Sequence, residues 1–294
     1  MINVMRVLFI LTFVFYGCNK EENDNISILP NVPPLKAYSC DSDSIPISIN
    51  AKNALMESGM SNCMMPFGVL ISADKNMPIL YLEMAGKILA EMLDQDLDGF
   101  MDDSSLFKYI SKWESAWLAM PTDYNKWETQ QLPILSNRLG YDIIIPSWWM
   151  GTIASQPNKR AIAVMVEEIT HFLTQFGYSP RYPEKFGVDD WSSVIAKETR
   201  NAQCVWWQHP ENECPNSPAQ INGDCSQPNC DVVEFYHQVL IIRAGMEPGW
   251  LGINFPSTSA ELEDVLSEEI TELMDDQKYH QLKTPLTFSY PLEN

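Results

Sequence analysis

The feature that most constrains this protein is its first segment, because it predicts that part of the chain never joins the fold. Residues 1–6 carry one positive charge, and the run from Val7 to Tyr16 is almost wholly apolar. This run is too short to span a bilayer as a helix, but it fits the apolar core of a secretory signal. We therefore expect residues 1–17 to be removed on export and the rest to fold in an oxidising compartment.

The residues that follow this signal suggest an anchor. Gly17-Cys18 resembles the bacterial lipoprotein cleavage site, in which the cysteine becomes the lipidated first residue. Cys18-Asn19-Lys20-Glu21-Glu22 resembles the signal that directs lipoproteins of one Gram-negative phylum to the outer face of the outer membrane. The resemblance implies a lipid anchor at Cys18, a flexible tether over residues 18–35 and a position at the cell surface. The alternative is an ordinary cleaved signal and a secreted product.

The cysteines agree with export. Without Cys18, six of the seven cysteines remain, an even number that favours disulfide bonds in an oxidising compartment. Cys40 and Cys63 stand apart from the others and are expected to pair. Connectivity stays open among the remaining four, and a structural zinc site built from them is the alternative, although their spacing lacks two Cys-x-x-Cys pairs. These four are Cys204, Cys214, Cys225 and Cys230.

Charge and composition exclude some kinds of partner. The formal net charge is -20 and the sequence pI is near 4.4. Nucleic acid and anionic lipid surfaces are bound by basic patches, so neither is expected as a partner. Of all 294 residues 45% are apolar, and the chain that remains after the signal is long enough for a real core. We expect one globular domain over residues 36–294, with an irregular cysteine-rich excursion at 204–230.

Apolar spacing predicts a mainly α fold with minor β (α+β), braced by disulfides. Thr258 and Glu261 form a capping-box pattern that marks the start of the last helix. A buried strand is expected at 141–145. Helices are expected at 78–93, 104–120, 161–176, 190–202, 231–243 and 258–274.

An acidic loop follows the first of these helices and predicts a calcium site. Its carboxylates stand at positions one, three and five of an EF-hand-like loop, and Gly99 stands at position six, where the sharp turn is needed. Position twelve is Ser105, where an EF-hand has a bidentate glutamate, so the loop is not a complete EF-hand. A solvated acidic turn without an ion is the alternative. The expected calcium ligands are Asp94, Asp96, Asp98, the Phe100 carbonyl, Asp102 and Asp103.

Two helices carry a Glu-x-x-His spacing, which places a carboxylate and an imidazole on one helix face. In the helix at 161–176, Glu168 and His171 have this spacing, and with Glu167 they lie opposite the apolar stripe. In the helix at 231–243, Glu234 and His237 repeat it among apolar residues on every side. A buried carboxylate is costly unless it is paired, protonated or bound to a metal. The alternative is a structural role for these glutamates and histidines.

Glu167, Glu168 and His171 also resemble the His-Glu-x-x-His motif of zincin metallopeptidases, with the first histidine replaced by Glu167. The resemblance covers five residues. It implies that His171 and Glu167 bind zinc, that Glu168 is the general base, and that the protein is a metal-dependent hydrolase acting on peptides. Glu234 or His237 would complete the ligand set.

Two other functions stay open. A di-iron carboxylate site would pair Glu168 with His171 and Glu234 with His237, and would take further ligands from Glu83 or Glu91 and from Glu198. The other function is that of a calcium-stabilised surface or adhesion lipoprotein without enzymatic activity. In such a protein these glutamates and histidines would be structural.

The tryptophan pairs could provide a platform for a peptide or glycan ligand. Trp148-Trp149 follows an apolar strand and is expected in the core, whereas Trp206-Trp207 is the better candidate for a binding surface.

Overall fold

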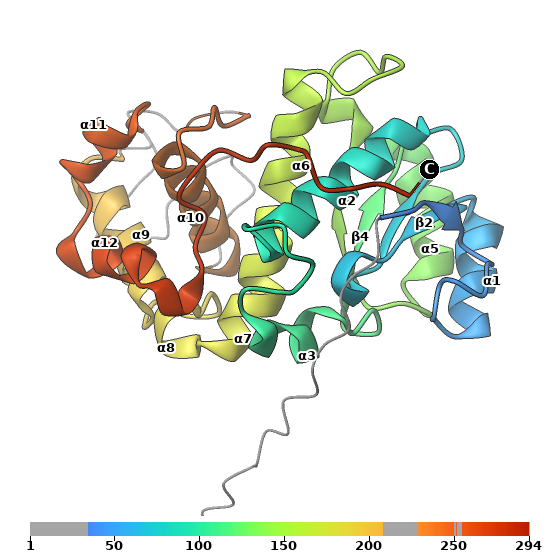
Figure 1. Ribbon diagram of the computed structural model, residues 1–294, viewed down its shortest axis with the longest axis horizontal. Helices are drawn as coiled ribbons and strands as arrows, with labels where there is room; N and C mark the ends of the chain where they lie inside the picture. The colour runs from blue at the N-terminus through green and yellow to red at the C-terminus, as the bar shows by residue number, and fades with distance from the viewer. Residues whose placement is uncertain (1–34, 208–227, 250, 252–254, 294) are drawn as a thin grey trace, which may run out of the picture.

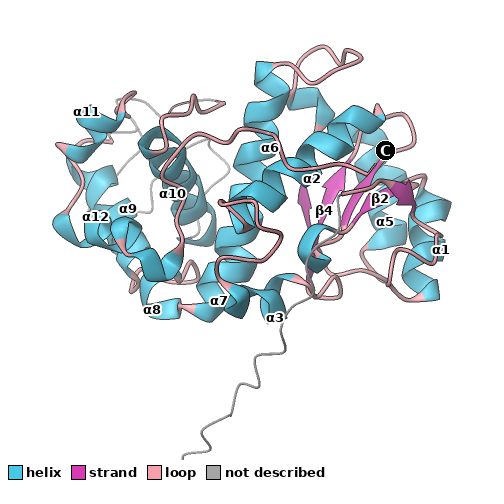
Figure 2. Cartoon of the chain, in the orientation of Figure 1, coloured by secondary structure: helices cyan, strands magenta, loops and turns pink. Residues whose placement is uncertain are grey.

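The computed structural model describes residues 35–207, 228–249, 251 and 255–293. The predicted signal, the predicted lipidation site Cys18 and nearly all of the tether lie outside these residues. Cys214 and Cys225 also lie outside them. Within the described chain, the fold is mainly helical with one small sheet, which confirms the predicted α+β class (Figure 2).

The elements alternate between strands and helices in the first half and are helical in the second (Figure 1). The strands are β1 (Tyr38–Ser39), β2 (Asn62–Met64), β3 (Ile71–Ala73), β4 (Ala116–Met120) and β5 (Tyr141–Ile144). The helices are α1 (Ile49–Ser58), α2 (Ile79–Leu93), α3 (Phe107–Ile110), α4 (Tyr124–Lys126), α5 (Leu132–Leu135), α6 (Lys159–Phe172), α7 (Ser179–Arg181), α8 (Pro183–Phe186), α9 (Val194–Val205), α10 (Pro228–Arg243), α11 (Ser259–Glu263) and α12 (Glu268–Asp275).

The sheet of the described chain is mixed and follows the order β1-β2-β3-β4-β5. The first three strands pair antiparallel, and β3, β4 and β5 pair parallel. Side chains alternate across β4, so that Trp117 joins the core against α1 and α5 while Leu118 joins the core against α2 and α6. Both faces of the sheet are therefore covered by helices.

Disulfides brace this fold. Cys40 and Cys63 are bonded, as predicted, and Cys63 lies in β2. Cys204 in α9 and Cys230 in α10 are also disulfide-bonded, which excludes both from a cysteine zinc site.

The C-terminal segment returns to the first half of the chain. The Glu91 carboxylate of α2 accepts hydrogen bonds from the backbone N–H groups of Thr287, Phe288 and Tyr290 at 2.8, 2.9 and 3.0 Å. Leu35 then pairs with the end of the chain through backbone hydrogen bonds to Pro291 and from Glu293. The last residues thus hold the two ends of the described domain together.

The predicted helix at 104–120 is wrong over its second half. Residues 104–106 form a 3-10 turn and α3 follows it, but Ala116–Met120 is strand β4, which lies between β3 and β5 in the sheet. All five residues of β4 are buried, and a short apolar run of this kind does not distinguish a buried strand from a buried helix. The predicted helix at 258–274 is divided into α11 and α12.

The predicted start of that helix is nearly right. The Thr258 side chain accepts a hydrogen bond from the Glu261 backbone, as a capping box requires. The Glu261 carboxylate accepts hydrogen bonds from the backbone and the side chain of Ser257. None of the helices among the described residues is long and apolar enough to cross a membrane.

Candidate metal centre

Helix α6 joins the two halves of the fold and positions the candidate site. It begins after Asn158, whose side chain accepts a hydrogen bond from the Ala161 backbone. One side of α6 packs on α2 and on strands β4 and β5, and another side packs on α10. Helix α10 packs in turn on α9. Side chains between α6 and α10 therefore lie at the junction of the sheet with the C-terminal helices.

Four predicted site residues meet at this junction, Glu167 and His171 from α6 and Glu234 and His237 from α10. Each offers one ligand atom, and these atoms all lie within 4.8 Å of one another. Zinc holds imidazole nitrogens and carboxylate oxygens at about 2.0–2.2 Å, so modest side-chain movement brings the four atoms around a single ion. The structure thus brings together the ligands predicted on the two helices.

The cluster is largely buried, and some of its ligand atoms lack a hydrogen-bond partner among the described residues. His237 is fully buried, and the exposed fractions of Glu167 and His171 are 5% and 6%. Within the described part of the chain, Nε2 of His171, Oε2 of Glu234 and both ring nitrogens of His237 have no hydrogen-bond partner. A buried polar atom without a partner costs about 1–3 kcal/mol. A bound cation would remove this cost.

The electrostatics of the cluster also favour a cation. Burial by itself lowers the pKa of His171, but the Glu234 and Glu168 carboxylates outweigh it and raise that pKa to about 9. Burial raises the pKa of Glu234, although the charge on His171 opposes this. Burial and the charge on His171 hold the pKa of His237 well below its usual range. His237 is therefore a neutral imidazole, the form that binds metals.

Glu168 lies at the opposite edge of the His171 ring from the predicted ligand Glu234. Its Oε2 lies 3.4 Å from Nδ1 of His171, whereas Oε2 of Glu234 lies 3.7 Å from Nε2 on the opposite edge of the ring. Glu168 is absent from the four-residue cluster that the described residues form. Its role as a general base stays a prediction.

The periodicity of the sequence predicted the burial of α10 correctly and the burial of α6 only in part. Helix α10 is buried on every side, as predicted, and Val232, Phe235 and Val239 are fully buried. In α6, Glu167, Glu168 and His171 are opposite the apolar stripe but are buried as well. The reason is that α10 covers this second face.

The acidic loop has the turn that its sequence predicts. Gly99 adopts a positive φ of 89°, and its N–H donates to the buried Asp94 carboxylate at 2.8 Å. Asp94, Asp96 and Asp102 each offer one oxygen, and these lie within 4.8 Å of one another. Burial raises the pKa of both Asp94 and Asp102. The side chains that would hold calcium are thus partly assembled.

Two other predicted calcium ligands, Asp98 and Asp103, accept hydrogen bonds from other residues. Asp98 is not in this group of three, and it accepts a hydrogen bond from the Phe100 N–H. Asp103 accepts from Ser105 and from the Tyr182 hydroxyl. Ser105, at position twelve, also accepts a hydrogen bond from Arg181 of α7. This end of the loop is used to attach α7. The Phe100 carbonyl stays a predicted ligand.

The extra ligands predicted for a di-iron site are engaged away from the cluster. Glu91 holds the C-terminal segment, and Glu198 accepts a hydrogen bond from the Ser267 backbone ahead of α12. Glu83 is partly buried and does not belong to the metal cluster found among the described residues.

The tryptophan predictions are corrected by the structure. Trp207 is only 3% exposed and Trp206 is partly buried, and both pack on Phe235 and Phe255 because they follow α9 into the second half of the core. This pair is core, not a binding platform. Trp148 is partly buried against the other core cluster, but Trp149, predicted in the core, is 48% exposed.

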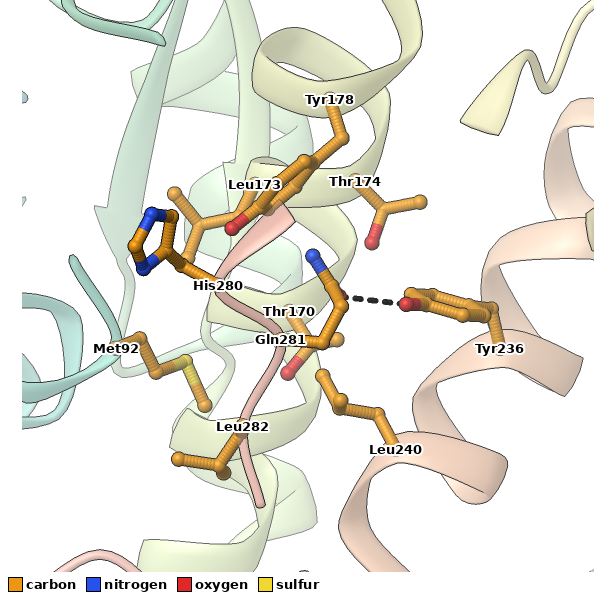
Figure 3. A pocket seen from close by; sticks show the side chains of 10 residues that line it. All are labelled: Met92, Thr170, Leu173, Thr174, Tyr178, Tyr236, Leu240, His280, Gln281 and Leu282. Atoms are coloured by element: carbon orange, nitrogen blue, oxygen red, sulfur yellow. Dashed lines mark hydrogen bonds between the residues drawn. The ribbon is translucent and has the colours of Figure 1, made fainter. Parts of the chain in front are cut away.

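Sequence reasoning missed a small cavity between α2, α6, α10 and the C-terminal segment (Figure 3). It has a volume of about 20 Å³, roughly the space of one water molecule, and its lining includes Thr170 and Thr174. Next to it the Tyr236 hydroxyl donates to Gln281 at 2.5 Å, which attaches α10 to the C-terminal segment. No sequence pattern links these two residues, which are 45 positions apart.

Comparison with known proteins finds no matching family model, no similar curated protein and no similar solved structure. Function is therefore inferred from the residues themselves.

Proposed function

We propose that this protein binds one zinc ion between α6 and α10 through Glu167, His171, Glu234 and His237. The observation that carries the proposal is the meeting of four ligand atoms within 4.8 Å of one another, from three buried residues and one partly buried residue. Two imidazoles and two carboxylates suit zinc, which prefers four-coordinate sites with nitrogen, sulfur or oxygen ligands. Iron is the competing ion for the same donors.

The proposed ion is structural. Four protein ligands fill a tetrahedral shell, whereas catalytic zinc sites keep one position for water or substrate. Two ligands come from the helix that packs on the sheet, and two come from a helix of the second half. The ion would therefore connect the two halves of the domain, much as the disulfides brace each half.

We propose calcium as a second ion, held in the acidic loop by Asp94, Asp96 and Asp102. Calcium takes carboxylate and carbonyl oxygens in flexible geometry, so the Phe100 carbonyl and water would complete its shell. The buried Asp94 also accepts a hydrogen bond from the Tyr290 hydroxyl at 3.0 Å. Calcium in this loop would consequently stabilise the docking of the C-terminal segment.

These ions fit a metal-stabilised surface or adhesion protein without enzymatic activity, anchored in the outer membrane through Cys18 or secreted. A zincin-like hydrolase acting on peptides stays a prediction, because it requires a water on the metal within reach of Glu168. Activity on unfolded protein substrates that disappears in Glu168→Gln would support the hydrolase.

Metal analysis of the purified protein tests the zinc proposal. After dialysis against zinc, we expect about one tightly held zinc ion per chain, and we expect its loss in His171→Ala and in Glu234→Ala. Glu198→Gln is a matched control, because this buried glutamate lies outside the cluster. Unchanged zinc content in both cluster variants would rule out the site, whereas iron lost in both variants would keep the site and rule out zinc as its ion.

A further inference from the structure

Each edge of the His171 ring faces a carboxylate, but the two carboxylates come from different elements. Glu168 belongs to α6 itself and lies 3.4 Å from Nδ1, one helical turn before the histidine. Glu234 belongs to α10 and lies 3.7 Å from Nε2. The first pair is therefore fixed within one helix, and the second depends on how two helices pack.

The free donor atoms show which edge of the ring faces the metal. Nε2 of His171 and Oε2 of Glu234 both lack a hydrogen-bond partner among the described residues, and Nδ1 of His171 is not among the orphaned atoms. The side chain of Glu168 is only 9% exposed, so solvent does not compete strongly for its contact with the ring.

From this geometry we infer that Glu168 is a positioning residue, which holds His171 by its Nδ1–H so that Nε2 is presented to the metal. This inference rests on the proposed zinc centre and gives Glu168 a different task from the general base that the zincin resemblance implies. Imidazole ligands commonly donate their second N–H to a carboxylate, which fixes the ring and makes the bound nitrogen a better donor.

His237 provides the contrast within the same site. Both of its ring nitrogens lack a partner in the described part of the chain, so no hydrogen bond there fixes the orientation of its ring. Its ring packs edge-on against His171 with the centroids 5.4 Å apart. Orientation of His171 by Glu168 therefore also limits where His237 can lie.

Zinc competition with a chromophoric chelator tests this role in the full protein. Removing a carboxylate that orients a ligand typically costs 10–100-fold in metal affinity. We expect a loss in that range for Glu168→Ala and a smaller one for Glu168→Gln, whose amide oxygen still accepts from Nδ1–H. The matched control Glu198→Ala should bind zinc like the wild type. Thermal unfolding without metal identifies any variant that fails to fold.

Long-range ¹H–¹⁵N NMR of the zinc-loaded protein gives a readout that a merely structural role would not change. The result expected is His171 protonated at Nδ1 and bound through Nε2. Zinc on Nδ1, or wild-type affinity in both Glu168 variants, would overturn the positioning role while leaving the zinc centre intact. Absence of zinc binding in the wild type would overturn the centre itself and this role with it.

Discussion

Glu234 is the ligand whose replacement separates metal binding from folding most clearly. In the metal-free protein its carboxylate is nearly buried, with Oε2 unpartnered among the described residues, and it lies close to His171. Burial and repulsion from Glu168 penalise its charge, while attraction to His171 favours it. Because Glu168 stays 3.4 Å from His171 and keeps that ring paired with a carboxylate, Glu234→Gln should cost the metal-free protein no more than about 3 kcal/mol, the lower end of the cost of breaking a buried ion pair.

The zinc-loaded protein should respond very differently. An ion present at about a thousand times its dissociation constant stabilises the native state by about 4 kcal/mol. For a domain of this size that corresponds to a rise in Tm of roughly 8–16 °C. Glu234→Gln replaces a charged ligand with a neutral amide, so most of this rise should be lost and less than about 3 °C should remain.

Thermal unfolding followed by circular dichroism, with zinc or with a chelator, measures both quantities. Glu198→Gln is the control, because it weakens a hydrogen bond by about 1 kcal/mol in both conditions and leaves the zinc-dependent rise unchanged. If Glu234→Gln kept the full rise, or if the wild type showed none, the reasoning would be refuted.

Three further predictions concern other parts of the structure. Burial raises the pKa of Asp142 in β5 to about 6, above the unfolded value near 3.9, so its charge destabilises the fold above pH 6 and not below pH 4. Asp142→Asn should therefore gain up to about 2 kcal/mol at pH 8, allowing for partial exposure, and nothing at pH 4, as urea midpoints would show. Glu91→Gln places an amide donor against backbone N–H groups of the C-terminal segment, so it should lower the free energy of unfolding by about 2–4 kcal/mol. Residues 285–293 should also be proteolysed faster. Unchanged stability would contradict the role of Glu91 in holding this segment. A Cβ at Gly249 would lie 3.3 Å from Oε2 of Glu167, so Gly249→Val should weaken zinc binding at least about tenfold in the chelator assay, and wild-type affinity would exclude this close approach.

The sequence predicted the helices that carry the site, because helical spacing is a local signal. Two Glu-x-x-His patterns on long helices identified Glu167, His171, Glu234 and His237, and α6 and α10 lie close to their expected positions. The turn at Gly99 was predicted for the same reason, since a fixed spacing of aspartates and glycine determines the loop.

Features that depend on long-range packing were not predictable. Strands β1, β2 and β3 have two or three residues each, too few for an alternating pattern. The apolar sequence of β4 is equally consistent with a buried helix. The helical wheel could not tell which side of α6 meets α10. It therefore left open whether Glu167 or Glu168 faces the metal, and only the packing of the two helices separates their positions.

Anomalous scattering at the zinc absorption edge, from crystals grown with zinc, tests the central claim most directly. We predict one strong peak between α6 and α10, at about 2.0–2.2 Å from one atom each of Glu167, His171, Glu234 and His237. Absence of a peak there, or a peak confined to the acidic loop at Asp94, would contradict the zinc centre.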